Sequence, residues 1–195
     1  TAAFGIALLA PLNPRFFGCQ ALVLCPTREL ADQVAKEIRR LARAADNIKV
    51  LTLCGGVPFG PQIGSLEHGA HVIVGTPGRV MDHLERKSLV LNDLQMLVLD
   101  EADEMLDMGF REDIERLMKA IPVERQTLFF SATIDGPIRR LIESYTRDPA
   151  LITVEHKAMT VPTVEQRYYE VMSRSKVEAL CRILALENPH LTLVF

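Results

Sequence analysis

The sequence lacks the features that would direct it to a membrane or a secretory pathway. It contains no apolar run of about 18 residues and no basic segment followed by an apolar one, so we expect a cytoplasmic protein that does not cross a membrane. Internal repeats and low-complexity tracts are also lacking. The net charge of -3 neither favours nor excludes nucleic acid, because a charge summed over the chain can hide a local basic face.

Cysteine is scarce, and its spacing excludes the common metal and redox motifs. None of the four cysteines forms a CxxC pair or has a histidine at zinc spacing, so we expect buried thiols. The histidines match no metal or nucleophile pattern and are expected to be structural. The residues concerned are Cys19, Cys25, Cys54, Cys181, His68, His71, His83, His156 and His190.

The sequence does contain a regular alternation of short apolar runs and amphipathic stretches of helical length. Most runs are apolar at successive positions, which is typical of strands covered by helices on both faces. The stretch from Arg28 to Ala45 has apolar residues at spacings of three and four, as expected for a helix with one buried face. The alternation predicts an α/β fold with a doubly wound parallel sheet. The expected strands are residues 21–25, 50–53, 72–74, 96–99, 127–130 and 151–154.

The alternation of apolar runs and amphipathic stretches is interrupted after Val154, which predicts a second unit. Residues 155–164 are polar and include Pro162, a composition that favours a linker. We therefore expect one domain over residues 1–154 and the beginning of another over residues 165–195. In that second unit the expected elements are a strand at 166–172, a helix at 175–187 and a strand at 191–195.

Three carboxylates directly follow one of the apolar runs. Asp100, Glu101 and Asp103 come after the strand expected at residues 96–99, and ligands of doubly wound sheets bind outside the carboxyl ends of the strands. The mutual repulsion of these side chains calls for a cation, which Mg²⁺ bound with a nucleotide would supply. Acidic residues are also favourable in the first turn of a helix, so the string alone is equally compatible with an ordinary helix start.

Residues 98–110 resemble the extended motif II of the DEAD-box ATP-dependent RNA helicases of superfamily 2. Five further stretches resemble other motifs of that family and occur in the family's order. They are Thr1, Pro26-Thr27-Arg28-Glu29-Leu30, Gly55-Gly56, Thr76-Pro77-Gly78-Arg79 and Ser131-Ala132-Thr133. The resemblance implies a RecA-like domain of the P-loop NTPase type over residues 1–154, a linker, and the start of a second RecA-like domain.

The resemblance also implies ATP and Mg²⁺ as cofactors and assigns roles around the carboxylates. Asp100 would hold Mg²⁺ through water, with Thr1 on the same ion, and Glu101 would orient and deprotonate the attacking water. Asp103 would link the nucleotide site to Ser131 and Thr133, the motif that couples hydrolysis to duplex opening. Taken alone, the Ser-Ala-Thr stretch is better explained as the start of a helix.

Backbone contacts to single-stranded RNA are implied for three of the motifs. The stretches Pro26-Thr27-Arg28 and Thr76-Pro77-Gly78-Arg79 each fall between an expected strand and a helix, where N–H groups and an arginine can receive phosphates. Taken alone, each stretch is a proline-assisted helix start with a solvated arginine. The segments 20–35 and 51–60 are similar to bacterial DbpA-type helicases, which implies ribosomal RNA as the partner, ribosome biogenesis and a monomer. The RNA-binding candidates are Pro26, Thr27, Arg28, Gly55, Gly56, Thr76, Pro77, Gly78 and Arg79.

The sequence contains no G-x-x-x-x-G-K-[ST] phosphate loop. Because Thr1 resembles the residue that follows the lysine of this loop, we expect the first domain to lack its P-loop strand and the chain to be a fragment without ATPase activity of its own. The parent is expected to couple ATP hydrolysis to local unwinding of RNA duplexes. Two alternatives stay open: a non-enzymatic RNA-binding or interaction fragment, and a DNA-acting motor of the same superfamily.

Overall fold

A computed structural model describes residues 1–45, 47–154, 165 and 167–194. The chain divides into two compact units, Thr1–Ala150 and Leu151–Phe195, and each is described by itself. Among the described residues, no helix is long and apolar enough to cross a membrane.

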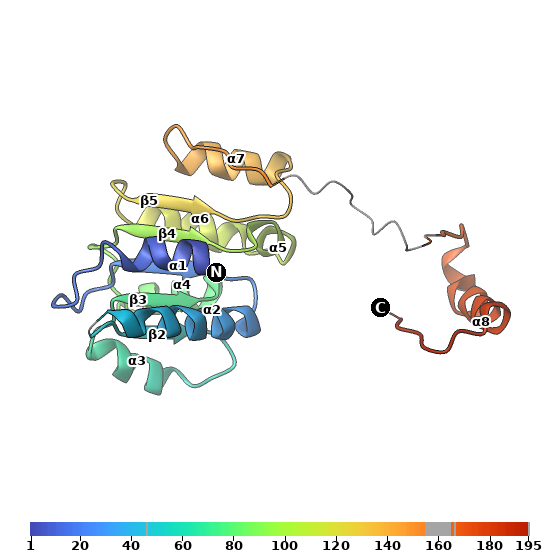
Figure 1. Ribbon diagram of the computed structural model, residues 1–195, viewed down its shortest axis with the longest axis horizontal. Coiled ribbons are helices and arrows are strands. Elements are labelled where there is room, and N and C mark those ends of the chain that lie inside the picture. The colour runs from blue at the N-terminus through green and yellow to red at the C-terminus, as the bar shows by residue number, and fades with distance from the viewer. Residues whose placement is uncertain (46, 155–164, 166, 195) are drawn as a thin grey trace. The chain divides into compact units, whose positions relative to one another are not determined.

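The first unit is built on a five-stranded sheet in which all pairings are parallel (Figure 1). The strand order β2-β3-β1-β4-β5 shows that the chain crosses over between strands, which confirms the predicted doubly wound α/β architecture. The strands are β1 (Ala21–Leu24), β2 (Val50–Leu53), β3 (Val72–Gly75), β4 (Met96–Leu99) and β5 (Gln126–Phe129).

Helices cover both faces of this sheet. Successive strand residues point to opposite faces, so Leu22 and Leu24 pack with α4 to α7, whereas Ala21 and Val23 pack with α1 and α2. Two hydrophobic cores result. The helices of this unit are α1 (Ala2–Leu9), α2 (Arg28–Leu41), η1 (Ala42–Ala44), α3 (Phe59–Glu67), α4 (Pro77–Glu85), α5 (Ala102–Asp107), α6 (Arg111–Ala120) and α7 (Gly136–Tyr145).

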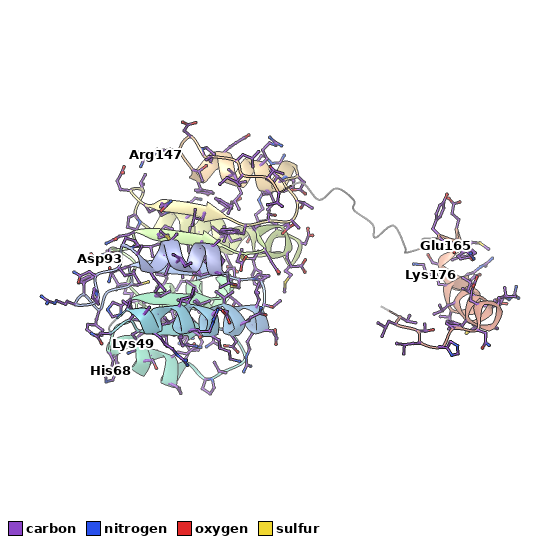
Figure 2. The ribbon with its side chains drawn as sticks, in the orientation of Figure 1. Lys49, His68, Asp93, Arg147, Glu165 and Lys176 are labelled. Carbon is purple, nitrogen blue, oxygen red and sulfur yellow. The ribbon has the colours of Figure 1, made fainter. Side chains whose placement is uncertain are left out.

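The register brings the carboxyl ends of the strands level with one another. Leu24 pairs with both Gly75 and Leu99, and Leu53 pairs with Gly75. The residues that follow the strands are therefore aligned along one edge of the sheet. Figure 2 shows Lys49 and Asp93, which precede β2 and β4, at the opposite edge from α5.

The second unit contains η2 (Ser173–Ser175) and α8 (Lys176–Glu187), close to the predicted helix. The predicted strand at 151–154 is wrong, and no strand occurs among the described residues of 166–172 and 191–195. A strand forms only by pairing with a neighbour, and Leu151 and Ile152 are instead 71% and 88% exposed. The predicted linker, residues 155–164, lies outside the described residues.

Candidate functional site

The acidic residues occupy the turn from β4 into α5. The Asp100 N–H donates to the Leu24 carbonyl (2.9 Å), and the Ala102 N–H donates to the Phe130 carbonyl (2.9 Å). Between them, Glu101 adopts the left-handed conformation, with φ 55° and ψ 55°. For a residue with a Cβ this conformation costs about 1–3 kcal/mol and is typical of functional sites. The chain thus turns from strand to helix at a single strained residue.

Burial and like charges make two of these carboxylates harder to ionise. Burial raises the pKa of Asp100 above its ordinary value. The pKa of Glu101 is raised by partial burial and then by the charges of Asp100 and Glu104. No ion pair within the described part of the chain includes any of these side chains, so the site has an excess of negative charge.

Asp103 joins this turn to the segment after β5. Its Oδ2 accepts hydrogen bonds from the N–H (2.9 Å) and the hydroxyl (3.0 Å) of Thr133. The Ser131 hydroxyl donates to the Thr133 carbonyl (2.7 Å), which fixes the same segment. Burial raises the pKa of Asp103, but the hydrogen bonds from Thr133 outweigh it and lower that pKa. The structure therefore brings together Asp103, Ser131 and Thr133, three residues that the family resemblance links.

We expect Thr133→Val to raise the pKa of Asp103 toward its ordinary value, because one of the three hydrogen bonds that the carboxylate accepts is removed. A depressed pKa contributes stability above the unfolded pKa of 3.8, and this contribution is lost as pH falls through the folded pKa. The loss at neutral pH should be about 0.5–1 kcal/mol for this partly exposed bond. A carbon-13 NMR titration of Asp103 checks the shift. Ser144→Ala, in α7, should leave it unchanged; an unchanged pKa in Thr133→Val would contradict the expectation.

The residues after β1 and β2 form a second cluster along the same edge. Thr27 is the N-cap of α2, where its hydroxyl accepts from the Leu30 N–H (3.2 Å). Arg28 is exposed, and its guanidinium lies close enough to Gly56 that a Cβ there would come within 3.4 Å of Nη1. Gly56 has a φ of 76°, which a glycine adopts without strain. An open groove of about 300 Å³ borders this cluster.

The segment after β3 is held more tightly than the sequence suggests. Pro77 begins α4 after Thr76, but Arg79 is not a solvated side chain. Its Nη1 donates to Gln62 Oε1 (3.1 Å), and its Nη2 donates to the Val57 carbonyl (3.1 Å). Sequence reasoning missed Gln62, since a lone glutamine in a helix gives no signal of burial.

The parallel sheet, the helices on both of its faces and the carboxylates after β4 agree with the RecA-like α/β domain that the family resemblance implies. The chain belongs to the DEAD/DEAH box helicase family, whose model matches residues 1–141. A crystal structure of a DEAD box protein from Methanococcus jannaschii matches with a TM-score of 0.76 and 41% identity, over 94% of this chain and 48% of that one. A Saccharomyces cerevisiae dbp5 structure matches with a TM-score of 0.66 and 34% identity, over 74% and 37%.

Curated relatives are similar over the whole chain. The ATP-dependent RNA helicase DbpA of Escherichia coli is 50% identical over 195 residues, which is 100% of this chain and 42% of the relative. The DEAD-box ATP-dependent RNA helicase CshA of Geobacillus kaustophilus is 48% identical over the same shares. The chain thus spans less than half the length of these relatives.

Proposed function

We propose that this chain is part of an ATP-dependent RNA helicase that couples ATP binding and hydrolysis to the local opening of RNA duplexes. The observation that carries the proposal is the bonding of Asp103 to Thr133, beside carboxylates at the edge where the RNA-binding candidates also lie. Residues 1–154 would form most of the first RecA-like domain, 155–164 the linker, and 165–195 the beginning of the second domain.

The chemistry of the carboxylates suits ATP hydrolysis. Asp100 and Thr1 would hold Mg²⁺, and the uncompensated negative charge at this turn fits a cation bound with phosphates. Among the described residues, no cluster of three or more acidic, histidine or cysteine side chains could hold a metal. A small number of protein ligands suits Mg²⁺, which usually keeps several waters and binds phosphate oxygens. When bound, the ion would neutralise charge on the phosphates.

Glu101 would orient the attacking water and accept its proton. A base works best when its pKa lies closer to the working pH, and the pKa of Glu101 is raised by partial burial and by Asp100. Asp103 would connect the nucleotide site to the segment that contains Ser131 and Thr133, because it accepts hydrogen bonds from Thr133. Hydrolysis and duplex opening would be coupled there.

The RNA would be bound through its sugar-phosphate backbone. The candidate groups follow β1, β2 and β3 at the same edge, and helix N-terminal N–H groups together with arginines are suited to phosphates. Such contacts position a strand without reading its bases. The proposed contacts come from Pro26, Thr27, Arg28, Gly55, Gly56, Thr76, Pro77, Gly78 and Arg79.

A ribosomal RNA substrate, a role in ribosome biogenesis, a cytoplasmic location and a monomeric state complete the proposal. They are supported by the similarity of segments 20–35 and 51–60 to DbpA-type helicases and by the 50% identity to the E. coli relative. The DNA-motor alternative is not favoured, because the relatives named above are RNA helicases.

Arg28→Ala should weaken the binding of this chain to single-stranded RNA about five- to tenfold and make the salt dependence shallower by about 0.7 in log-log slope, as for the loss of one phosphate contact. Fluorescence anisotropy with a labelled oligouridine measures both quantities. Arg43→Ala provides the matched control, since this exposed arginine lies in η1 after the far end of α2. A DNA oligomer of equal length tests sugar preference. Equal slopes for wild type and Arg28→Ala would exclude the assigned contact.

A further inference from the structure

Gln62 is the one buried residue of helix α3, although its side chain is polar. It is 7% exposed, and every polar atom of the amide has a partner. Its Nε2 donates to the Cys54 carbonyl (3.1 Å). Its Oε1 accepts from Arg79 Nη1 (3.1 Å) and lies 2.9 Å from His83 Nε2. This single amide therefore links α3, the segment after β2 and helix α4.

The partners of His83 settle its protonation. The Gln62 amide faces it with an oxygen, so the Nε2 of His83 carries a proton and donates. Burial and then the positive charge of Arg79 lower the pKa of His83, which leaves the imidazole neutral with Nδ1 as an acceptor. The Ser88 hydroxyl lies 2.8 Å from Nδ1 and 3.1 Å from the His83 carbonyl oxygen, so these two acceptors share its single proton. Ser88, His83 and Gln62 thus form a continuous chain of hydrogen bonds.

Arg79 extends this chain to the loop after β2. Besides the Gln62 oxygen it binds the Val57 carbonyl (3.1 Å), and its guanidinium lies 4.0 Å from the centre of the Phe59 ring. The Phe59 ring also contacts the His83 ring, with centroids 4.8 Å apart. Two of the five N–H groups of Arg79 are used within the protein, so the others are held in a fixed orientation.

We propose that Gln62 and His83 are positioning residues that fix the loop of residues 54–57 against the start of α4, and so set the spacing between two groups of RNA-backbone contacts. The inference rests on the proposed function, because the loop contains Gly55 and Gly56 and the helix start contains Thr76 to Arg79. Buried polar groups that are fully satisfied rigidify their surroundings. Binding at two sites is tighter when their spacing is set before RNA arrives.

The order of the loop can be tested without RNA, through the reactivity of the Cys54 thiol. Cys54 is 4% exposed, and burial raises its pKa to about 11, so labelling reports opening of the segment. In a Cys181→Ser background, which removes the exposed cysteine, Gln62→Leu and His83→Leu should speed labelling of Cys54 about tenfold. Labelling of Cys25, buried after the central strand β1, should change less than twofold.

The same variants should raise the dissociation constant for labelled oligouridine about tenfold. His83→Gln keeps an N–H donor for Gln62 and should stay within about threefold of wild type in both measurements. Glu67→Gln, at the exposed end of α3, is the control for a change in that helix. Mass spectrometry of each labelled cysteine and anisotropy provide the readouts.

Three results would overturn the inference. They are an unchanged labelling rate of Cys54 in Gln62→Leu, an equal increase in the labelling rates of Cys54 and Cys25, and faster labelling of Cys54 in a variant that still binds RNA with wild-type affinity. A different result bears on the proposed function. If the wild-type chain binds no oligouridine, the RNA contacts assigned to this edge are wrong, whereas the labelling rates still decide whether Gln62 and His83 fix the loop.

Discussion

Glu101→Gln should lower RNA-stimulated phosphate release by about 100- to 10 000-fold. The amide has the size of the carboxylate but does not accept a proton from water at neutral pH. The change is best made in a helicase in which this chain replaces the aligned segment of the E. coli relative, since the two are 50% identical over 195 residues. Release of inorganic phosphate, with and without RNA, measures the effect.

The neighbouring Glu104 provides a matched control. It is exposed in the first turn of α5, and Glu104→Gln should leave the maximal rate within about twofold of the unmodified chimera. Because its charge helps to raise the pKa of Glu101, this control should also lower that pKa slightly. If Glu101→Gln hydrolysed ATP as fast as Glu104→Gln, Glu101 would not be the base.

The pH dependence follows from the same electrostatics. A general base acts when deprotonated, and partial burial with the charges of Asp100 and Glu104 raises the pKa of Glu101 above its ordinary 4.5. The kcat/KM for ATP, which reports the pKa of the free enzyme, should therefore rise with pH through a value above 4.5 and then level off. In Glu104→Gln the rising part of the pH profile should move to lower pH.

The centre of the sheet could be predicted from the sequence because β1, β3 and β4 are buried on both faces. The run at 96–99 consists of apolar residues at successive positions, and β4 spans Met96–Leu99 as predicted. The run at 151–154, which is apolar at three of its four positions, does not form a strand. Local sequence gives the tendency to be a strand, whereas pairing depends on which neighbours are present.

The grouping of Asp103 with Ser131 and Thr133 was expected from the family resemblance, because each stretch taken alone was compatible with an ordinary helix start. Carboxylates directly after a buried strand predict a ligand edge, and Asp103 does reach Thr133 across 30 residues. The left-handed conformation of Glu101 has no sequence signal, because glutamate rarely adopts it. The burial of Gln62 and His83 also has no sequence signal, since their mutual contact joins two helices across 21 residues.

Gly75→Ala should lower the free energy of unfolding by about 3 kcal/mol, at the upper end of the range for overpacking. Gly75 ends β3 opposite Leu53 of β2, and a Cβ there would lie 2.3 Å from the Leu53 carbonyl oxygen and 2.9 Å from a methyl group of Val80. That oxygen also accepts from the Thr76 N–H (3.1 Å). To accommodate the methyl group, β2 and β3 would have to separate at the ends that lead into the loop of residues 54–57 and into α4. The affinity for RNA should therefore fall as well.

Gly64→Ala separates this steric effect from the general effect of replacing glycine. Gly64 lies within α3, and a Cβ there meets nothing within 4 Å, so alanine should stabilise the protein by about 0.5–1 kcal/mol through its helix propensity. The two glycine variants should therefore differ by about 4 kcal/mol in opposite directions from wild type, seen as shifts of the urea midpoint at constant slope. Equal midpoints would mean that β2 and β3 accommodate the methyl group, and the close approach at Gly75 would then not fix the spacing of the two segments that are proposed to bind RNA.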